Sequence, residues 1–244
     1  MAECTLYRYE DVLARLHALA DEKYRDFHAK LVPGEQSIIG VRSPELKKLS
    51  RELLSGEWLK FLAEPCAAEQ PNEMLVLKGL VVGGAKCGYA EKLEYAAKHV
   101  PLLRNWAQVD SLAASFKDTA KHLEQAYAFI QPYLESQAEY EVRFGVVMLL
   151  SYFRTDAYIQ RTLDNLTRVR HEGCYAKVAV AWAVSCCFIS HRAPTLSLLQ
   201  SGTLDDFTHS RSIQKTIESY RVSDEDKKLL AQLRRKAGVR GKGV

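Results

Sequence analysis

Apolar residues recur every three or four positions along most of this chain, which is the spacing of amphipathic α-helices rather than of β-strands. The pattern predicts a first helix over 12–19 and a second over 24–31, which Pro33 and Gly34 end. A short extended connector is expected over 38–42. The same spacing predicts further helices over 72–82, 89–99, 111–118, 123–134, 139–153, 157–168, 175–189, 194–200, 204–220 and 224–235.

Short joints separate these helices, and Pro and Gly fall mostly within them. One joint ends with Ser43 followed by Pro44, which predicts a serine N-cap with proline at the first helical position. Helices joined by short turns form pairs, and stacked pairs make a solenoid. We therefore predict an all-α fold, a curved α-solenoid of degenerate HEAT-like repeats with a concave face, as a single domain over 1–236. Residues 237–244 are predicted to be a flexible basic tail.

The composition is that of a globular chain, since 244 residues with 47% hydrophobic content are enough to bury a sizeable core. The net charge of +4 is mild, so a nucleic-acid partner has to be argued from where the charges cluster. The six cysteines form no Cys-x-x-Cys pair and no His–Cys spacing that suits zinc, so no metal site is expected. Neither a secretory signal nor an apolar run of about 20 residues is found, so we expect a cytoplasmic protein outside the membrane.

Four residues are the candidates for chemistry. Trp106 and Asp110 are four positions apart, which places an aromatic ring beside a carboxylate on one helical face. Arg143 and Trp182 follow at intervals close to the period of a two-helix repeat. Successive repeats are therefore expected to aim all four side chains into one groove.

Each of these residues also has a plain structural interpretation. Asp110 is followed by Ser111, so its carboxylate could simply cap a helix. The two tryptophans could belong to the core, as their type more often does. Arg143 is harder to explain in this way, because a guanidinium in an apolar stretch must reach a carboxylate, a phosphate or solvent.

With these four residues and the stretches 23–33, 39–49 and 212–221, the chain resembles the AlkD-type DNA alkylation-repair glycosylases, which are built from HEAT-like repeats. The resemblance extends from about Tyr24 to Arg235. It implies that Asp110 is the catalytic carboxylate and that Arg143 contacts the neighbouring DNA backbone. It also implies that Trp106 and Trp182 are aromatic walls around the deoxyribose of the lesion.

The expected reaction is the hydrolytic excision of cationic N3- or N7-alkylated purines from double-stranded DNA. Such a base already carries a positive charge and leaves without protonation, so the protein has to stabilise the oxocarbenium-like sugar. A carboxylate and aromatic faces suit that cation. The resemblance therefore implies a monofunctional glycosylase that acts as a monomer and needs no cofactor. Lys177, five residues before Trp182, is the one nearby candidate for covalent chemistry and is given little weight.

A second group of residues is expected to contact DNA phosphates, because its members are basic and plausibly placed, and Lys47, Lys48 and Arg51 among them lie within one helical turn and are expected to form a local basic patch. The group consists of Arg42, Lys47, Lys48, Arg51, Lys177, Arg211, Lys215 and Arg221. The plain alternative for each is a solvated surface charge.

Two other functions stay open from the sequence. A catalytically silent relative would keep the helical repeats and the DNA affinity but use Asp110 as a helix cap. A protein scaffold would bind peptides in its groove, and its groove would be mixed or acidic rather than basic.

Overall fold

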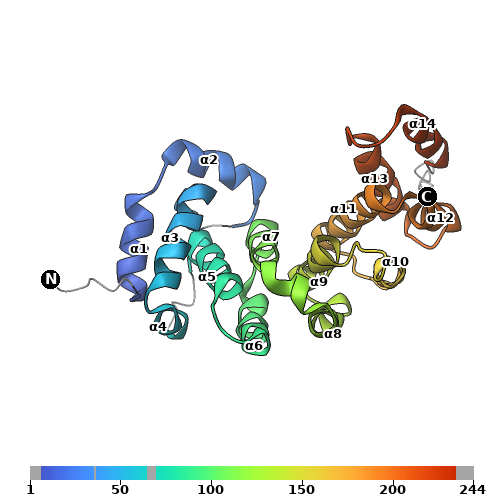
Figure 1. Cartoon of the computed structure of the whole chain (residues 1–244). Helices are drawn as coiled ribbons and strands as arrows, with labels where there is room; N and C mark the ends of the chain where they lie inside the picture. The colour runs from blue at the N-terminus through green and yellow to red at the C-terminus, as the bar shows by residue number, and fades with distance from the viewer. Residues whose placement is uncertain (1–6, 36, 65–69, 235–244) are drawn as a thin grey trace, which may run out of the picture. The chain divides into compact units, whose positions relative to one another are not determined.

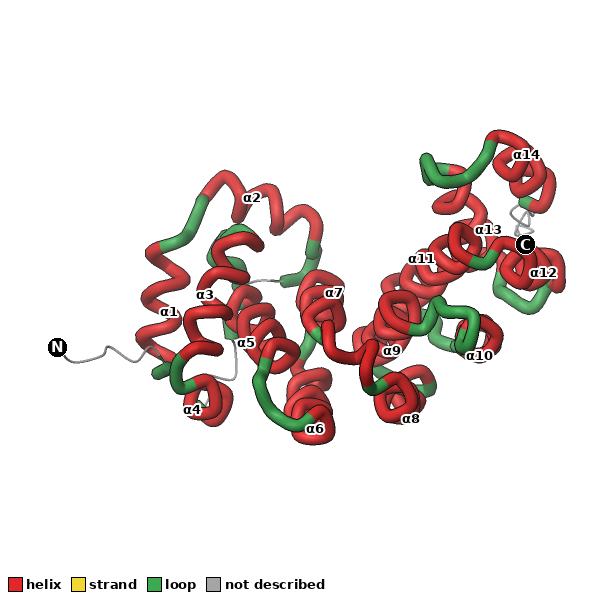
Figure 2. Tube along the Cα trace, in the orientation of Figure 1, coloured by secondary structure: helices red, strands yellow, loops and turns green. Residues whose placement is uncertain are grey.

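The computed structural model describes residues 7–35, 37–64 and 70–234. These residues form fourteen α-helices and two 3-10 helices, and no strand occurs among them (Figure 2). The predicted all-α helical-repeat architecture is therefore confirmed. The predicted tail, 237–244, lies outside the described residues.

The chain divides into two compact units, Met1–Ile130 and Gln131–Val244 (Figure 1). The first unit contains helices α1 (Tyr9–Ala18), α2 (Glu22–Leu31), α3 (Ser43–Ser55), α4 (Trp58–Ala63), α5 (Asn72–Gly84), α6 (Tyr89–His99), η1 (Val100–Leu102), α7 (Trp106–Ser115) and η2 (Lys117–Lys121). Helix α8 (Leu123–Leu134) crosses the boundary. The second unit contains α9 (Glu139–Tyr152), α10 (Ile159–Arg168), α11 (Cys174–Ser190), α12 (Arg192–Ser201), α13 (Asp206–Ile217) and α14 (Asp224–Leu233).

Helix α5 is the centre of the first unit, and it is apolar on nearly all sides because it packs between α3 and α7. Its residues Met74, Leu77 and Val81 are fully buried and meet Leu53 and Phe61 in the core. Full burial on all sides explains why the sequence of α5 shows almost no polar face. Helix α7 is thereby held against the most buried helix of its unit.

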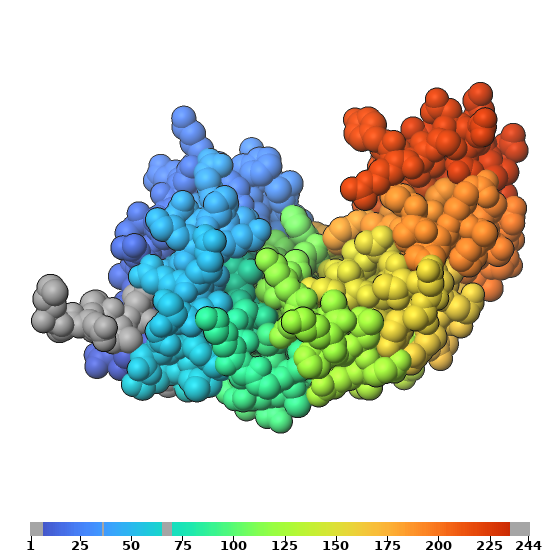
Figure 3. All heavy atoms as spheres, viewed as in Figure 1, coloured from blue at the N-terminus to red at the C-terminus, as the bar shows by residue number. Residues whose placement is uncertain are grey.

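Helix α11 has the same position in the second unit, where it packs against both α9 and α13. Ala176, Ala179 and Ala183 along it are completely buried. Their small side chains let neighbouring helices approach closely. Figure 3 shows the heavy atoms of the chain, and within each unit the colour changes gradually, because helices that follow one another in the sequence lie side by side.

Several predicted helix boundaries differ from those observed. Ser43 is the first residue of α3, follows the N-cap residue Arg42 and makes no capping bond, so the predicted serine cap is wrong. Helix α4 was not predicted, because its six residues are too few to show a helical period. The helix predicted over 111–118 begins earlier, at Trp106, and ends at Ser115. Within the described ranges, no helix is both long and apolar enough to span a membrane.

Candidate functional site

The N-terminus of α7 is capped by Asn105. Its side-chain carbonyl accepts hydrogen bonds from the backbone N–H groups of Ala107, at 3.0 Å, and Gln108, at 3.1 Å. Asp110 is the fifth residue of this helix, so it does not cap it, and the capping interpretation of Asp110 is wrong. Asn105 and Gln108 also have the spacing of a capping box, and this signal would have placed the start of the helix.

Trp106 and Asp110 lie one helical turn apart on α7, and both are partly exposed. The indole Nε1–H of Trp106 donates to the backbone carbonyl of Leu31 at 2.9 Å, at the end of α2. Trp106 therefore does not lie in the buried core. This bond fixes the ring by joining α7 to α2, although Trp106 and Leu31 lie 75 positions apart in the sequence.

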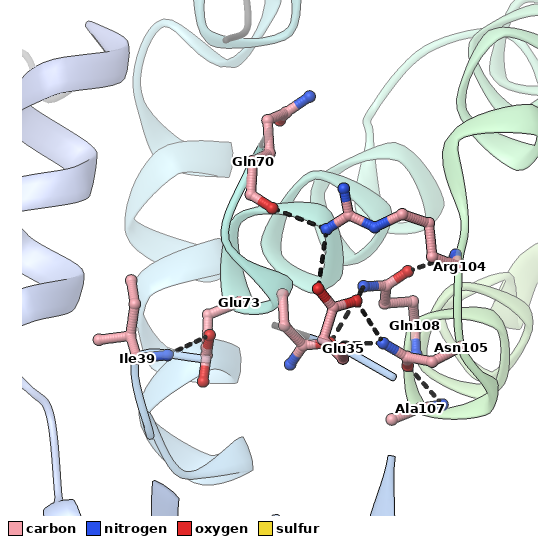
Figure 4. Close-up of polar contacts among 9 residues, drawn as sticks. Glu35, Ile39, Gln70, Glu73, Arg104, Asn105, Ala107 and Gln108 are labelled. Atoms are coloured by element: carbon pink, nitrogen blue, oxygen red, sulfur yellow. Dashed lines mark hydrogen bonds and ion pairs between the residues drawn. The ribbon is translucent and has the colours of Figure 1, made fainter. Parts of the chain in front are cut away.

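A buried carboxylate supports the start of α7 from the segment that follows α2 (Figure 4). The side chain of Glu35 is 6% exposed and forms an ion pair with Arg104 at 3.1 Å. Its other oxygen accepts from the side-chain amides of Asn105, at 3.1 Å, and Gln108, at 3.3 Å. Glu35 therefore binds three residues within and just before the first turn of α7.

Asn72, the first residue of α5, completes this network. Its side-chain oxygen accepts from the amide of Asn105 at 2.9 Å and from that of Gln108 at 3.0 Å. The amide oxygen of Gln108 in turn accepts from the backbone N–H of Arg104 at 2.7 Å. We call Glu35, Asn72, Arg104, Asn105 and Gln108 the α7 anchor. Its bonds fix the position of the helix that carries Trp106 and Asp110.

The connector between α2 and α3 is held by Glu73, which is completely buried. Its carboxylate accepts from three successive backbone N–H groups, those of Ile39 at 3.0 Å, Gly40 at 2.7 Å and Val41 at 3.3 Å. Gly40 has a φ of +97°, and a Cβ there would lie 2.6 Å from the carbonyl oxygen of Asp21. Only glycine fits this turn without strain, which explains the Gly in the predicted connector.

In the second unit, Arg143 and Glu139 hold the backbone of Tyr175 at the start of α11. Arg143 is 5% exposed, and its Nη1 donates to the carbonyl of Tyr175 at 3.1 Å. Glu139, one turn earlier on α9, accepts from the N–H groups of Tyr175 at 2.5 Å and Ala176 at 3.4 Å. The buried guanidinium thus fastens α9 to α11, a role that the sequence did not predict.

Trp182 lies on α11, about two turns after Tyr175, and is partly exposed. Its neighbours Ala181 and Ala183 are completely buried. The indole of Trp182 therefore lies on the less buried side of α11. Trp182 is not a fully buried core residue.

The predicted phosphate contacts in the first unit differ in their surroundings. Lys47, Lys48 and Arg51 are exposed on α3, where their spacing places them within one turn. Arg42 is also exposed, but its guanidinium donates to Asp21 at 2.8 and 3.0 Å and lies over the ring of Tyr24. The three residues of the predicted basic patch are therefore all exposed, whereas Arg42 is paired with Asp21.

In the second unit, Arg211 on α13 and Arg221 just after it are exposed, whereas Lys215 is partly exposed. Lys177 forms an ion pair with Glu172 at 2.7 Å. The hydrogen bond to Glu172 raises the pKa of Lys177. A lysine that forms a Schiff base needs a lowered pKa, so the structure gives covalent chemistry at Lys177 no support.

In the part of the chain that the structure describes, no group of three or more His, Cys, Asp or Glu residues is placed to hold a metal ion. The side chains of the α7 anchor are instead bonded to one another. Sequence reasoning missed Glu35 and Asn72, because their contacts with α7 join segments far apart in the chain.

Comparison with known proteins places this architecture in a family. A search of the curated proteins returns no match for the chain. The family model described as DNA alkylation repair enzyme matches residues 12–200, which include α5, α7, α9 and α11 with all four candidate residues. On this match, which covers most of its length, the chain belongs to the DNA alkylation repair enzyme family.

Proposed function

We propose that the protein is a monofunctional DNA glycosylase that excises cationic N3- or N7-alkylated purines from double-stranded DNA. The observation that carries this proposal is the state of Asp110. It is partly exposed, lies one turn from Trp106, and is not used as the cap of α7 because Asn105 has that role. A carboxylate beside an aromatic ring on an anchored helix is well suited to a reaction that develops positive charge.

The reaction needs little else, because the alkylated base already carries a positive charge and leaves as a neutral molecule. The deoxyribose becomes an oxocarbenium-like cation, which the carboxylate of Asp110 stabilises electrostatically. A charge pair at about 4 Å is worth about 4 kcal/mol at an effective dielectric of 20. This energy corresponds to about a thousandfold in rate. Water then attacks the sugar, so no cofactor is required.

The aromatic residues have a supporting role in this proposal. The face of a tryptophan ring attracts a cation by roughly 0.5–2 kcal/mol, depending on how far water is excluded. Trp106, and Trp182 of the second unit, are proposed to face the sugar of the lesion. Arg143 is proposed to contact the DNA backbone beside it. We further propose that the enzyme acts as a monomer in the cytoplasm.

The experiment is the release of N7-methylguanine from duplex DNA under single-turnover conditions, with the wild-type protein and Asp110→Asn. We expect the substitution to reduce the rate by about a hundredfold to a thousandfold. Asp164→Asn is the matched control, because Asp164 is an exposed carboxylate on α10 and its neutralisation changes the net charge equally. This control is expected to leave the rate unchanged.

Two results would reject the proposal. If the wild-type protein releases no base above the spontaneous rate yet binds DNA, the chain is a silent DNA-binding member of its family. If Asp110→Asn releases the base as fast as wild type, the carboxylate has no part in catalysis. The same assay on N3-methyladenine and bulkier adducts ranks the lesions.

A further inference from the structure

A cavity of about 240 Å³ lies in the second unit, between the loop that precedes α11 and the start of α13. Its interior is apolar and formed by the buried side chains of Leu166, Val180 and Leu204. Its remaining lining is polar or charged apart from Val169, and the charged residues are Arg170, Glu172, Lys177 and Asp205. The proposed catalytic roles use none of these residues, so the cavity needs an explanation of its own.

The two carboxylates near Lys177 differ in how firmly they are held. The carboxylate of Asp205 caps α13, since it accepts from the N–H groups of Phe207 and Thr208 at 3.1 Å each, and it lies 4.0 Å from the Lys177 ammonium. Glu172 lies closer to that ammonium, at 2.7 Å, yet its side chain is 94% exposed. Asp205 is therefore a fixed part of the fold, whereas Glu172 can leave its position with little loss of packing.

The loop that carries Glu172 is itself well anchored. The Nε2–H of His171 donates to the carbonyl of Gln137 at 3.0 Å, and its Nδ1 accepts from the N–H of Gly173 at 2.9 Å. Both chain neighbours of Glu172 are thus held in place. A movement of Glu172 consequently needs only side-chain rotation, and the cavity keeps its shape.

We propose that this cavity is a binding site for a phosphate group of the DNA backbone, with Lys177 and Arg170 as its ligands and Glu172 as an internal competitor. In the free protein Glu172 neutralises the Lys177 ammonium. On binding, the phosphate takes the place of the Glu172 carboxylate, which turns into solvent. The proposal depends on DNA binding and not on glycosylase chemistry.

Once the Glu172 carboxylate has turned into solvent, the lining carries the two cations Arg170 and Lys177 against the one carboxylate of Asp205, which favours an anionic ligand. Lys177 is 20% exposed, so its ammonium is partly shielded from water, and a charge-assisted bond there is stronger than at an open surface. Arg170 is exposed, and its Nη1 donates to the backbone carbonyls of Thr167 and Val169, which orient the guanidinium. The phosphate replaces Glu172 as the partner of Lys177 and gains Arg170 as a second partner, so the competitor lowers affinity without abolishing it.

The test is the affinity for an undamaged duplex, measured by fluorescence anisotropy over a series of salt concentrations. We expect Glu172→Gln to tighten binding by about three- to tenfold at low salt and to steepen the salt dependence by up to about 0.9 in the logarithmic slope. Lys177→Gln is expected to weaken binding. Adding Glu172→Gln to Lys177→Gln should give no further gain, because the competitor then has nothing to compete for.

Glu225→Gln is the matched control, since Glu225 is an exposed glutamate on α14 of the same unit and its neutralisation adds the same net charge. If Glu225→Gln tightens binding as much as Glu172→Gln, the effect is one of overall charge and the proposal is overturned. Persistence of the Glu172→Gln gain in the Lys177→Gln background overturns it as well. Because the DNA is undamaged, neither outcome depends on whether the protein excises bases.

Inorganic phosphate provides a second probe, followed through the NMR signals of the Lys177 side chain in Glu172→Gln. A saturable shift is expected, and its absence would overturn the proposal. If phosphate shifts these signals while the duplex affinities of wild type, Glu172→Gln and Lys177→Gln agree, the site belongs to a free phosphate ligand and the assignment to DNA is wrong.

Discussion

The carboxylate of Glu35 accepts a hydrogen bond from the side-chain amide of Asn105 at 3.1 Å, although the two residues lie 70 positions apart in the sequence. Asn105 in turn caps α7 through its carbonyl oxygen. Glu35, which follows α2, therefore stabilises the N-terminus of the helix that carries Trp106 and Asp110.

The first prediction concerns this contact. Glu35→Ala removes one of the acceptors of Arg104, Asn105 and Gln108 in a site where Glu35 is only 6% exposed. Their other acceptors, Asn72 and the carbonyl of Gln70, remain. We expect the free energy of unfolding to fall by about 2–3 kcal/mol. Urea denaturation measures it. Glu135→Ala, at an exposed position, is the control and should stay within about 0.5 kcal/mol of wild type. Equal stabilities for the two variants would contradict the anchoring role.

The second prediction concerns the indole of Trp106. Trp106→Phe keeps an aromatic face but removes the Nε1–H that bonds to the carbonyl of Leu31. We expect a loss of about 0.5–1.5 kcal/mol in stability and a slower excision of N7-methylguanine, because the ring is less well oriented. Trp106→Ala should slow excision further. Trp58→Phe on α4 is the control, and excision by this variant should match wild type.

The third prediction compares two glycines with the same backbone conformation. Gly173 precedes α11 with φ −60° and ψ 137°, and Gly88 precedes α6 with φ −58° and ψ 143°. A Cβ at Gly173 would lie 2.4 Å from an oxygen of Glu139, whereas a Cβ at Gly88 would meet nothing within 4 Å. Gly173→Ala must therefore displace Glu139 from the start of α11.

We expect Gly173→Ala to lower the free energy of unfolding by about 1–2 kcal/mol, the usual value of a lost helix cap. Gly88→Ala should be neutral or slightly stabilising, because alanine restricts the unfolded chain. Thermal and chemical denaturation of both variants decide this point. In the Glu139→Ala background, Gly173→Ala should cost much less, and a full cost there would refute the explanation.

The fourth prediction concerns pH. Burial lowers the pKa of His99 to about 4, and its Nε2–H donates to the carbonyl of Leu75 at 3.0 Å. The unfolded chain binds a proton at this residue near pH 6.5, whereas the folded chain does so only near pH 4. The contribution of neutral His99 to the free energy of unfolding is therefore complete above about pH 6.5. It is lost as the pH falls toward 4, by an amount on the order of 3 kcal/mol.

Denaturation of wild type and His99→Gln at several pH values between 7 and 4 isolates this contribution, because the carboxylates are common to both proteins. We expect the stability difference between wild type and variant to shrink as the pH falls. A difference that is constant over this range would show that His99 does not titrate between the two states.

Most of the helices were predictable because their apolar residues recur with helical spacing, although α5 and α11 are apolar on nearly all sides. Only the shortest, α4, was missed outright, and the ends of α7 were misplaced. The helix begins at Trp106 and not at 111, because Asn105 caps it, and Asn105 and Gln108 have the spacing of a capping box. Local spacing thus predicted which segments are helical better than it predicted where they begin.

The candidate site was predictable only in part. Residue type and spacing singled out Trp106, Asp110, Arg143 and Trp182, and the structure gives the tryptophans and the aspartate partly exposed positions. The hydrogen bonds of Glu35 with Asn105 and of Arg143 with Tyr175 were beyond the sequence, since they join segments that only the packing of helices brings together. Only the structure therefore shows that these two bonds hold the helices that carry the candidate residues.

The sparse packing of α2 has a consequence for how the protein loses activity. Its one buried residue is His28, and Phe27 and Leu31 remain exposed, so this helix has few contacts to keep it in place. Such segments open locally at a lower free energy than the whole domain. When the end of α2 opens, Trp106 and the start of α7 lose their partners while α5 and its core stay folded. Warming should therefore inactivate the protein before it melts.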